Sequence, residues 1–104
     1  MRDYNYVSDT VDAFLLAGEK AAAIGEVFNV GSGKATSIKE LVSMIVSLFE
    51  LEGRIKISYT NKSWPGDIKT LLADTSKIEK KLGFKSKVNL KTGLRMLKTW
   101  ILEN

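Results

Sequence analysis

The chain has 104 residues, which is the length of one domain and enough for one modest core. It contains no cysteine and no histidine, which excludes disulfides, thiol nucleophiles, zinc ribbons and histidine-based general bases. With 16 basic and 12 acidic residues the net charge is +4, which favours anionic partners. Lysines spread over a solvated surface would give the same balance.

No run of apolar residues approaches the roughly 20 that a membrane span needs. The N-terminal residues MRDYNY are not followed by the apolar stretch of a signal peptide. We therefore expect a cytoplasmic protein without membrane contact.

The first third of the chain predicts a strand, a helix and a second strand. The aromatic alternation of residues 3–7 predicts the first strand. Ser8 or Asp9 is expected to cap the following helix, and Gly25 to end it. Residues 26–30 (EVFNV) predict the second strand.

The middle of the chain predicts a buried helix and a third strand. Ser37 and Glu40 have the spacing of a capping box, in which each side chain satisfies an open backbone N–H of the other. The helix that they begin carries a wide apolar face and should be well buried. Residues 54–59 (RIKISY) alternate apolar and polar side chains, which is typical of a half-buried strand.

The last third predicts a loop and two helices. Residues 61–67 form the loop, and a short helix is expected over residues 75–82, ended by Gly83. Asn89 should cap the final helix. The expected fold class is α/β, with a small three-stranded sheet and about four helices. Because so small a sheet is marginal for an independent core, the chain resembles a part of something larger.

The loop from Gly31 to Thr36 lies between a predicted strand and a predicted helix, which invites two phosphate-binding interpretations. The dinucleotide fingerprint needs a third glycine where Thr36 stands. The phosphate-loop pattern needs Ser or Thr where Ala35 stands, and a glycine where Phe28 stands. A tight turn in which glycines permit positive φ explains the loop more simply.

No self-contained catalytic constellation is found. No tyrosine is followed by lysine four residues later, and the absence of histidine excludes a serine–histidine–aspartate triad. Asp9 and Asp12 are explained by their favourable position near a helix N-terminus, while Asp67 and Asp74 have no obvious partner. We therefore expect no catalytic residue and no metal site in this chain.

Residues 77–91 hold the densest group of lysines: Lys77, Lys80, Lys81, Lys85, Lys87 and Lys91. A nucleic-acid site would need these lysines on one face with aromatic rings for stacking, and only Phe84 is nearby. A solvated edge is the simpler interpretation. The ring of Trp64 suits either a core anchor for its loop or a stacking partner for a base or sugar.

Taken together, segments along nearly the whole chain resemble one family, the extended short-chain dehydrogenase/reductases that act as NAD-dependent nucleotide-sugar epimerases and dehydratases of the UDP-glucose 4-epimerase type. The segments are similar to the family motifs in order and spacing. They are RDYNYVSD (2–9), EVFNVGSG (26–33), WPGD (64–67), ADTSK (73–77), LGF (82–84) and the closing helix from Leu90 to Trp100.

The resemblance covers only the C-terminal third of such an enzyme. It implies that residues 1–104 form a single C-terminal substrate-binding domain or fragment, without the N-terminal cofactor-binding domain. The family's glycine-rich cofactor loop and its Tyr-x-x-x-Lys catalytic pair lie upstream. The chain alone should therefore bind no cofactor and catalyse nothing, whereas the complete enzyme would use NAD.

The resemblance also implies substrate-binding residues. Arg2 matches the arginine that holds a phosphate of the sugar nucleotide, and Asp67 matches the aspartate that reaches the ribose. Asn29 matches an asparagine that shapes the loop near the substrate. The family's second phosphate arginine is replaced by Trp64, and Lys62 is expected to substitute for it as a less precise point charge.

Two further expectations concern partners. If a domain is missing, the helix with Val11, Phe14 and Leu15 should expose apolar surface, which would drive self-association or pairing with a separately encoded N-terminal half. The rival interpretation is a stand-alone, non-enzymatic basic module that binds nucleic acid or a protein partner through the lysines of residues 77–91. In that case Arg2 would form only a surface ion pair, with a neighbouring aspartate such as Asp3 or Asp9.

Overall fold

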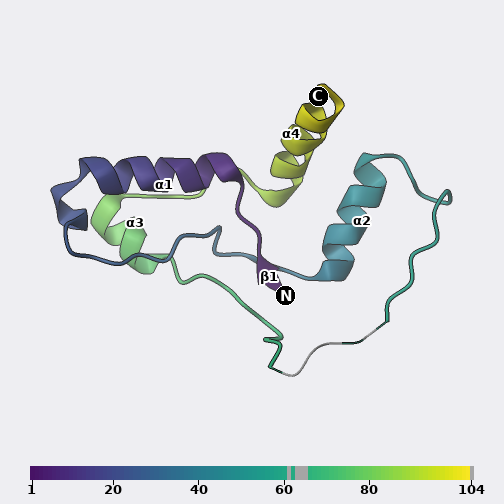
Figure 1. The fold of residues 1–104 in the computed structure, drawn as a ribbon, viewed down its shortest axis with the longest axis horizontal. Helices are drawn as coiled ribbons and strands as arrows, with labels where there is room; N and C mark the ends of the chain where they lie inside the picture. Colours follow the sequence, from purple (N-terminus) through teal and green to yellow (C-terminus); the bar gives the residue numbers. More distant parts are fainter. Residues whose placement is uncertain (61, 63–65, 104) are drawn as a thin grey trace.

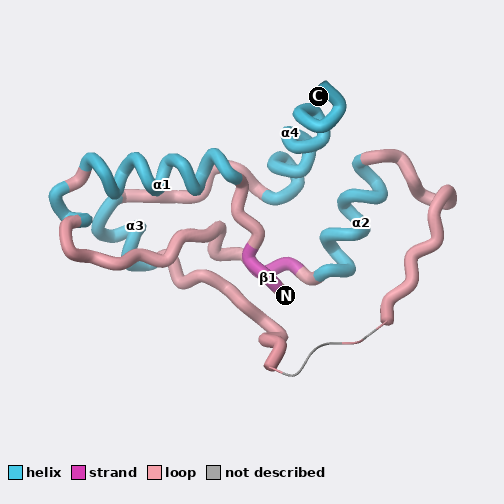
Figure 2. Tube along the Cα trace, in the orientation of Figure 1, coloured by secondary structure: helices cyan, strands magenta, loops and turns pink. Residues whose placement is uncertain are grey.

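The structure, a computed structural model, describes residues 1–60, 62 and 66–103. These residues form four α-helices, one short 3₁₀ helix and two very short strands, which are joined by loops (Figures 1 and 2). In chain order they are β1 (Arg2–Asp3), α1 (Val7–Glu19), η1 (Ala21–Ala23), β2 (Ala35–Thr36), α2 (Ile38–Leu48), α3 (Ser76–Leu82) and α4 (Leu90–Glu103).

Within the described residues the sheet has two strands instead of the three expected. β1 and β2 pair antiparallel, with Arg2 opposite Thr36 and Asp3 opposite Ala35. On its other side, β1 forms an isolated parallel bridge to Leu71, whose backbone N–H donates to the carbonyl of Met1 at 2.9 Å. Three distant parts of the chain therefore meet at the first residues.

The three strands predicted from the sequence were wrong, apart from Asp3. Residues 3–7 contribute only Asp3 to a strand, because α1 already begins at Val7. Residues 26–30 and 54–59 form no strand. Alternation marks side chains suited to a half-covered surface, but a strand also needs a hydrogen-bonded neighbour. Val27 is 81% exposed and Ile55 50% exposed, so no such surface covers them among the described residues.

The expected boundaries of α1 were also wrong. Its N-cap is Tyr6, which makes no side-chain capping bond, whereas the carboxylate of Asp9 is engaged by a distant loop. The helix ends at Glu19, well before Gly25, because Lys20 is extended with φ −94° and ψ 125°. Gly25 follows η1 and has φ 72°.

The other helix signals are confirmed, except that only one of the two bonds of the expected capping box forms among the described residues. Ser37 Oγ accepts from the backbone N–H of Glu40 at 3.1 Å, and Asn89 Oδ1 accepts from that of Thr92 at 2.8 Å. Gly83 ends α3 in the left-handed conformation, with φ 71°. Residues that satisfy open helix ends act locally, which explains why these boundaries follow from sequence.

The fully buried hydrophobic core is small. It consists of Ala13, Ile78, Leu82 and Phe84, which join α1 to α3. The expectation that α2 is well buried was wrong, because the described structure buries none of its residues fully. The radius of gyration is 16.7 Å, against about 13 Å for a compact domain of this size. The chain is therefore less compact than a typical domain of its length.

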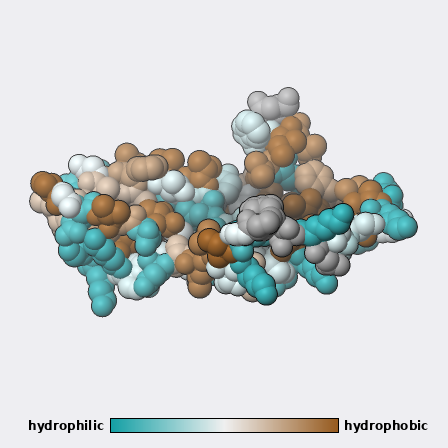
Figure 3. Space-filling view, turned by 60° about the horizontal axis from the view of Figure 1, so that its bottom comes forward, coloured by the Kyte–Doolittle hydropathy of each residue, from teal (hydrophilic) through white to brown (hydrophobic). Residues whose placement is uncertain are grey.

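Apolar side chains remain on the surface as a result. The predicted exposure on α1 is confirmed, with Val11 47%, Phe14 73% and Leu15 58% exposed. Hydrophobic surface alternates with hydrophilic surface over the face in Figure 3, including the projecting helix α4. None of the helices in the described ranges is long and apolar enough to cross a membrane.

Candidate functional site

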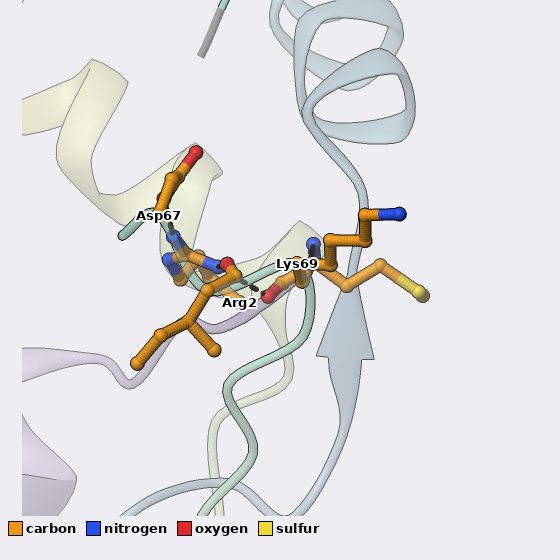
Figure 4. A network of polar contacts seen from close by, with 5 residues as sticks. Arg2, Asp67 and Lys69 are labelled. Atoms are coloured by element: carbon orange, nitrogen blue, oxygen red, sulfur yellow. Dashed lines mark hydrogen bonds and ion pairs between the residues drawn. The ribbon is translucent and has the colours of Figure 1, made fainter. Parts of the chain in front are cut away.

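The structure brings two of the predicted site residues into direct contact. Arg2 Nη2 lies 3.1 Å from Asp67 Oδ1, although 65 residues separate them in sequence (Figure 4). Arg2 Nη1 donates to the carbonyl of Ile68 at 2.6 Å and to that of Met1 at 2.9 Å. The N-terminal ammonium group donates to the carbonyl of Lys69 at 2.5 Å. These contacts fix the guanidinium beside residues 67–69.

The ion pair keeps part of its hydrogen-bonding capacity. A guanidinium has five N–H donors, and Arg2 uses three of them within the described residues. Its Nε proton and one Nη2 proton have no acceptor there. The Asp67 Oδ2 atom likewise accepts no hydrogen bond from the described residues. The side chains are 34% and 25% exposed, so a ligand can reach both groups.

Asp3 fastens this site to two other segments, a role that the sequence analysis missed. Its carboxylate accepts from the backbone N–H groups of Ser32 at 2.9 Å, Gly33 at 3.0 Å and Ala73 at 3.3 Å. It also accepts from the Ser32 hydroxyl at 2.5 Å. Burial raises the pKa of Asp3, but these hydrogen bonds outweigh burial and lower it below the ordinary 3.8.

Gly31 is required by close packing at the same junction. A Cβ atom at this position would lie 2.6 Å from the Cβ of Ala73 and 2.7 Å from Oδ2 of Asp3. The neighbouring loop N–H groups of Ser32 and Gly33 already bind the Asp3 carboxylate. These residues therefore do not fit the pyrophosphate of a dinucleotide, and the simpler interpretation of the loop as a turn agrees with the structure.

The remaining predicted residues are not gathered as tightly. Asn29 shares a cavity of about 480 Å³ with Arg2 and Asp3. Lys62 donates from its backbone N–H to Thr60 Oγ1 at 3.4 Å, and within the described ranges its side chain contacts neither Arg2 nor Asp67. Trp64 lies outside the described residues.

Two carboxylates have partners that the sequence did not suggest. Asp9 is 1% exposed and accepts from Ser86 Oγ at 3.0 Å and from the N–H groups of Lys87 at 3.1 Å and Val88 at 3.0 Å. Burial raises the pKa of Asp9, and these bonds together lower it below 3.8. Asp74 accepts from the backbone N–H of Ser76 at 3.0 Å and from its hydroxyl. Of these two sets of partners, only that of Asp74 could have been expected from the sequence, because Ser76 lies two residues away.

Three of the six lysines in the basic segment form ion pairs within the molecule. Lys77 and Lys81 each lie 2.8 Å from the carboxylate of Glu26, and Lys85 lies 3.6 Å from Glu79. Hydrogen bonds from Lys77 and Lys81, together with their positive charges, lower the pKa of Glu26 to about 2. The rival nucleic-acid interpretation therefore loses part of the charge on which it depends.

Comparison with known proteins gives a consistent result. Residues 1–97 match the protein family described as GDP-mannose 4,6 dehydratase. The chain is 39% identical over 103 residues to UDP-arabinose 4-epimerase 1 of Arabidopsis thaliana, covering 96% of this chain and 24% of that protein. It is 34% identical over 110 residues to UDP-glucose 4-epimerase 1 of Oryza sativa subsp. japonica, covering 100% of this chain and 30% of that protein.

A solved structure agrees with these matches. The UDP-glucose 4-epimerase of Thermotoga maritima, determined with UDP-glucose, superimposes with a TM-score of 0.82 at 34% identity. The match covers 97% of this chain and 31% of that one. The chain therefore belongs to the family of NAD-dependent nucleotide-sugar epimerases and dehydratases. It spans less than a third of the length of the relatives named here.

Proposed function

We propose that this chain is the C-terminal substrate-binding part of a nucleotide-sugar epimerase or dehydratase. In this role it binds the diphosphate and ribose of a nucleotide sugar. The observation that carries the proposal is the 3.1 Å contact between Arg2 and Asp67, because it joins the two residues that the resemblance assigns to these groups.

The free atoms of the pair suit a nucleotide diphosphate. Arg2 is permanently charged, and its two remaining N–H donors can bind a phosphate oxygen each. Asp67 Oδ2 can accept from a ribose hydroxyl. An ion pair at this exposure contributes only about 0.2–1 kcal/mol to stability, so a ligand that rearranges it loses little.

Chemistry would come from elsewhere in the complete enzyme. Members of the family use NAD, and the glycine loop described here does not fit that cofactor. We place the cofactor-binding part and the catalytic pair in the two thirds of the relatives' length that this chain does not match. The chain then orients the substrate, and binding energy is converted into positioning. Alone it should neither bind NAD nor epimerise a sugar.

The proposal includes an association partner. The exposed apolar side chains of α1 would pack against the cofactor-binding part or, in its absence, against a second copy of this chain. The proposed function requires neither nucleic acid nor a membrane as a partner.

The test is a ¹⁵N–¹H NMR titration of the 104-residue chain with UDP-glucose, the ligand named for the Thermotoga relative. We expect saturable shifts at Arg2, Asn29 and residues 66–69. Arg2→Gln should weaken binding roughly tenfold, because a charge-assisted contact is lost. Lys56→Gln, a matched change of one positive charge away from the site, should not. A dispersed spectrum that does not respond to millimolar UDP-glucose would refute the proposal.

A further inference from the structure

The cavity that contains Arg2 is built from three segments that are far apart in the sequence. Its volume is about 480 Å³, and its lining comes from β1, from residues 29–30 and from residues 71–74. The bridge between Arg2 and Leu71 attaches the last of these segments to β1. Residues 29–30 form no strand in the described structure, so their position depends on other contacts.

The Asp3 side chain supplies these contacts and holds both segments at once. Its Oδ1 atom accepts from the backbone N–H and from the hydroxyl of Ser32, two residues beyond the 29–30 lining. Its Oδ2 atom accepts from the backbone N–H groups of Gly33 at 3.0 Å and Ala73 at 3.3 Å. A single carboxylate therefore fixes the separation between residues 29–33 and residues 71–74.

The Asp3 carboxylate is not available to bind a ligand itself. A carboxylate has about four lone-pair positions, and each of its two oxygens already accepts two hydrogen bonds here. Arg2 and Asp67 differ in this respect, because they keep donor and acceptor positions without a partner among the described residues. Asp3 lines the same cavity, but it can act only by positioning other groups.

The junction around this carboxylate has little free space. A Cβ atom at Gly31 would lie 2.7 Å from Asp3 Oδ2 and 2.6 Å from the Cβ of Ala73. Closely packed groups of this kind transmit a displacement to their neighbours, because there is no void to absorb it. A change at Asp3 should therefore move at least one of the two segments that line the cavity.

We propose that Asp3 is a positioning residue for the nucleotide sugar, which holds residues 29–33 and 71–74 at the separation at which the ligand fits against Arg2. A cavity that already has its binding shape loses less conformational freedom when the ligand enters. Ligand binding and the Asp3 contacts are therefore coupled, and each strengthens the other. The inference rests on the proposed function for the identity of the ligand.

The first experiment measures the dissociation constant of UDP-glucose for Asp3→Asn by ¹⁵N–¹H NMR, at a temperature at which the chain is folded. An amide keeps one acceptor oxygen and turns an NH₂ group toward backbone donors, so one of the two segments is released. We expect the dissociation constant to rise about five- to tenfold.

Asp9→Asn is the matched control for this substitution. It alters a second carboxylate that is held by backbone N–H groups and a serine hydroxyl, but Asp9 does not line the cavity. The control should destabilise the fold and still leave the dissociation constant of the folded chain within about twofold. A merely structural role of Asp3 would make the two variants behave alike.

Hydrogen exchange of the unaltered chain tests the coupling without any substitution. UDP-glucose should increase the protection of the amide protons of Ser32, Gly33 and Ala73, which donate to Asp3. The increase should be at least about fivefold larger than for the amides of Lys87 and Val88, which donate to Asp9 and report the general stability.

The outcomes separate this inference from the proposed function. If UDP-glucose binds and Asp3→Asn has the dissociation constant of the unaltered chain, Asp3 does not position the ligand, while the proposed function stands. Equal increases in protection at the amides bound to Asp3 and to Asp9 lead to the same conclusion. If Asp9→Asn weakens binding as much as Asp3→Asn, lost stability explains both and the inference is wrong. If the unaltered chain does not bind UDP-glucose, the proposed function fails and the inference fails with it.

Discussion

Ser86 Oγ donates to Asp9 Oδ2 at 3.0 Å, linking the first turn of α1 to the loop before α4 across 77 residues. The same carboxylate accepts from the backbone N–H groups of Lys87 and Val88. Because Asp9 is 1% exposed, no water can replace these donors without opening the structure. The position of α4 therefore depends on one buried charge.

Asp9→Asn should accordingly destabilise the fold. An amide offers one acceptor oxygen and places an NH₂ group against backbone donors, so we expect a loss of about 2–4 kcal/mol. Urea unfolding followed by far-UV circular dichroism measures this. Asp12→Asn, on the same helix, should cost less than about 1 kcal/mol, since Asp12 contributes chiefly through the helix dipole. Equal losses in the two variants would contradict the role given to Asp9.

Stability should fall in acid partly because of Asp3 and Asp9, in addition to Glu26 and Asp74, whose pKa values are also lowered. The pKa values of Asp3 and Asp9 are lowered from 3.8 in the folded chain, so the unfolded state binds protons first as the pH decreases. Their contribution is complete above about pH 3.8 and is lost as the pH falls through the lower folded values. Unfolding free energies measured between pH 6 and pH 2.5 should show this slope, and Asp9→Asn should flatten it. If the unfolding free energy of Asp9→Asn depends on pH as steeply as that of the unaltered chain, Asp9 is not a source of the acid sensitivity.

Gly31→Ala should disrupt the junction below the candidate site. The added methyl group would lie 2.6 Å from the Cβ of Ala73, so the backbone must shift, at a cost of about 1–3 kcal/mol. Gly18→Ala is the opposite case, because nothing lies within 4 Å of its Cβ position in α1. It should stabilise the chain by about 0.5–1 kcal/mol through helix propensity. Thermal unfolding should therefore show a lower melting temperature for Gly31→Ala and a higher one for Gly18→Ala.

Phe14→Glu should reduce self-association. Phe14 is 73% exposed on α1, and a charge at its position would be desolvated in any apolar contact. Sedimentation equilibrium of the unaltered chain should reveal reversible association at high concentration, and the variant should shift the balance toward monomer. Ile55→Glu serves as a comparison, since Ile55 is also exposed, at 50%, but lies in a different segment. A chain that is monomeric at every concentration would remove the need for a covering partner.

The parts of the fold that sequence predicted correctly are those decided locally. The caps at Ser37 and Asn89 and the left-handed Gly83 each involve atoms within a few residues of one another. The exposed face of α1 followed from the resemblance to a larger enzyme, which implied a missing neighbour. Family motifs likewise selected Arg2 and Asp67, which the structure joins.

The parts that sequence missed are decided by contacts between distant segments. The segment 54–59 has the right alternation for a strand, but Ile57 is 42% exposed and has no neighbouring strand in the described structure. The Asp3 carboxylate serves partners that are 29, 30 and 70 residues away. No periodicity along the chain encodes such a partner, and a local interpretation of Asp9 as a helix cap was wrong for the same reason.

The pairing of Arg2 with Asp67 also has a consequence for folding and for tolerance to insertions. Residues 49–60, 62 and 66–70 contain no helix or strand, and the pair forms only when the long segment between α2 and Asp67 brings its two ends together. The helices can form from nearby residues, so the half-site should be among the last parts to assemble. Closure entropy rises slowly, by roughly 0.6 kcal/mol for each doubling of loop length. This segment can therefore change in length and sequence between related proteins while the two charges at its end still meet.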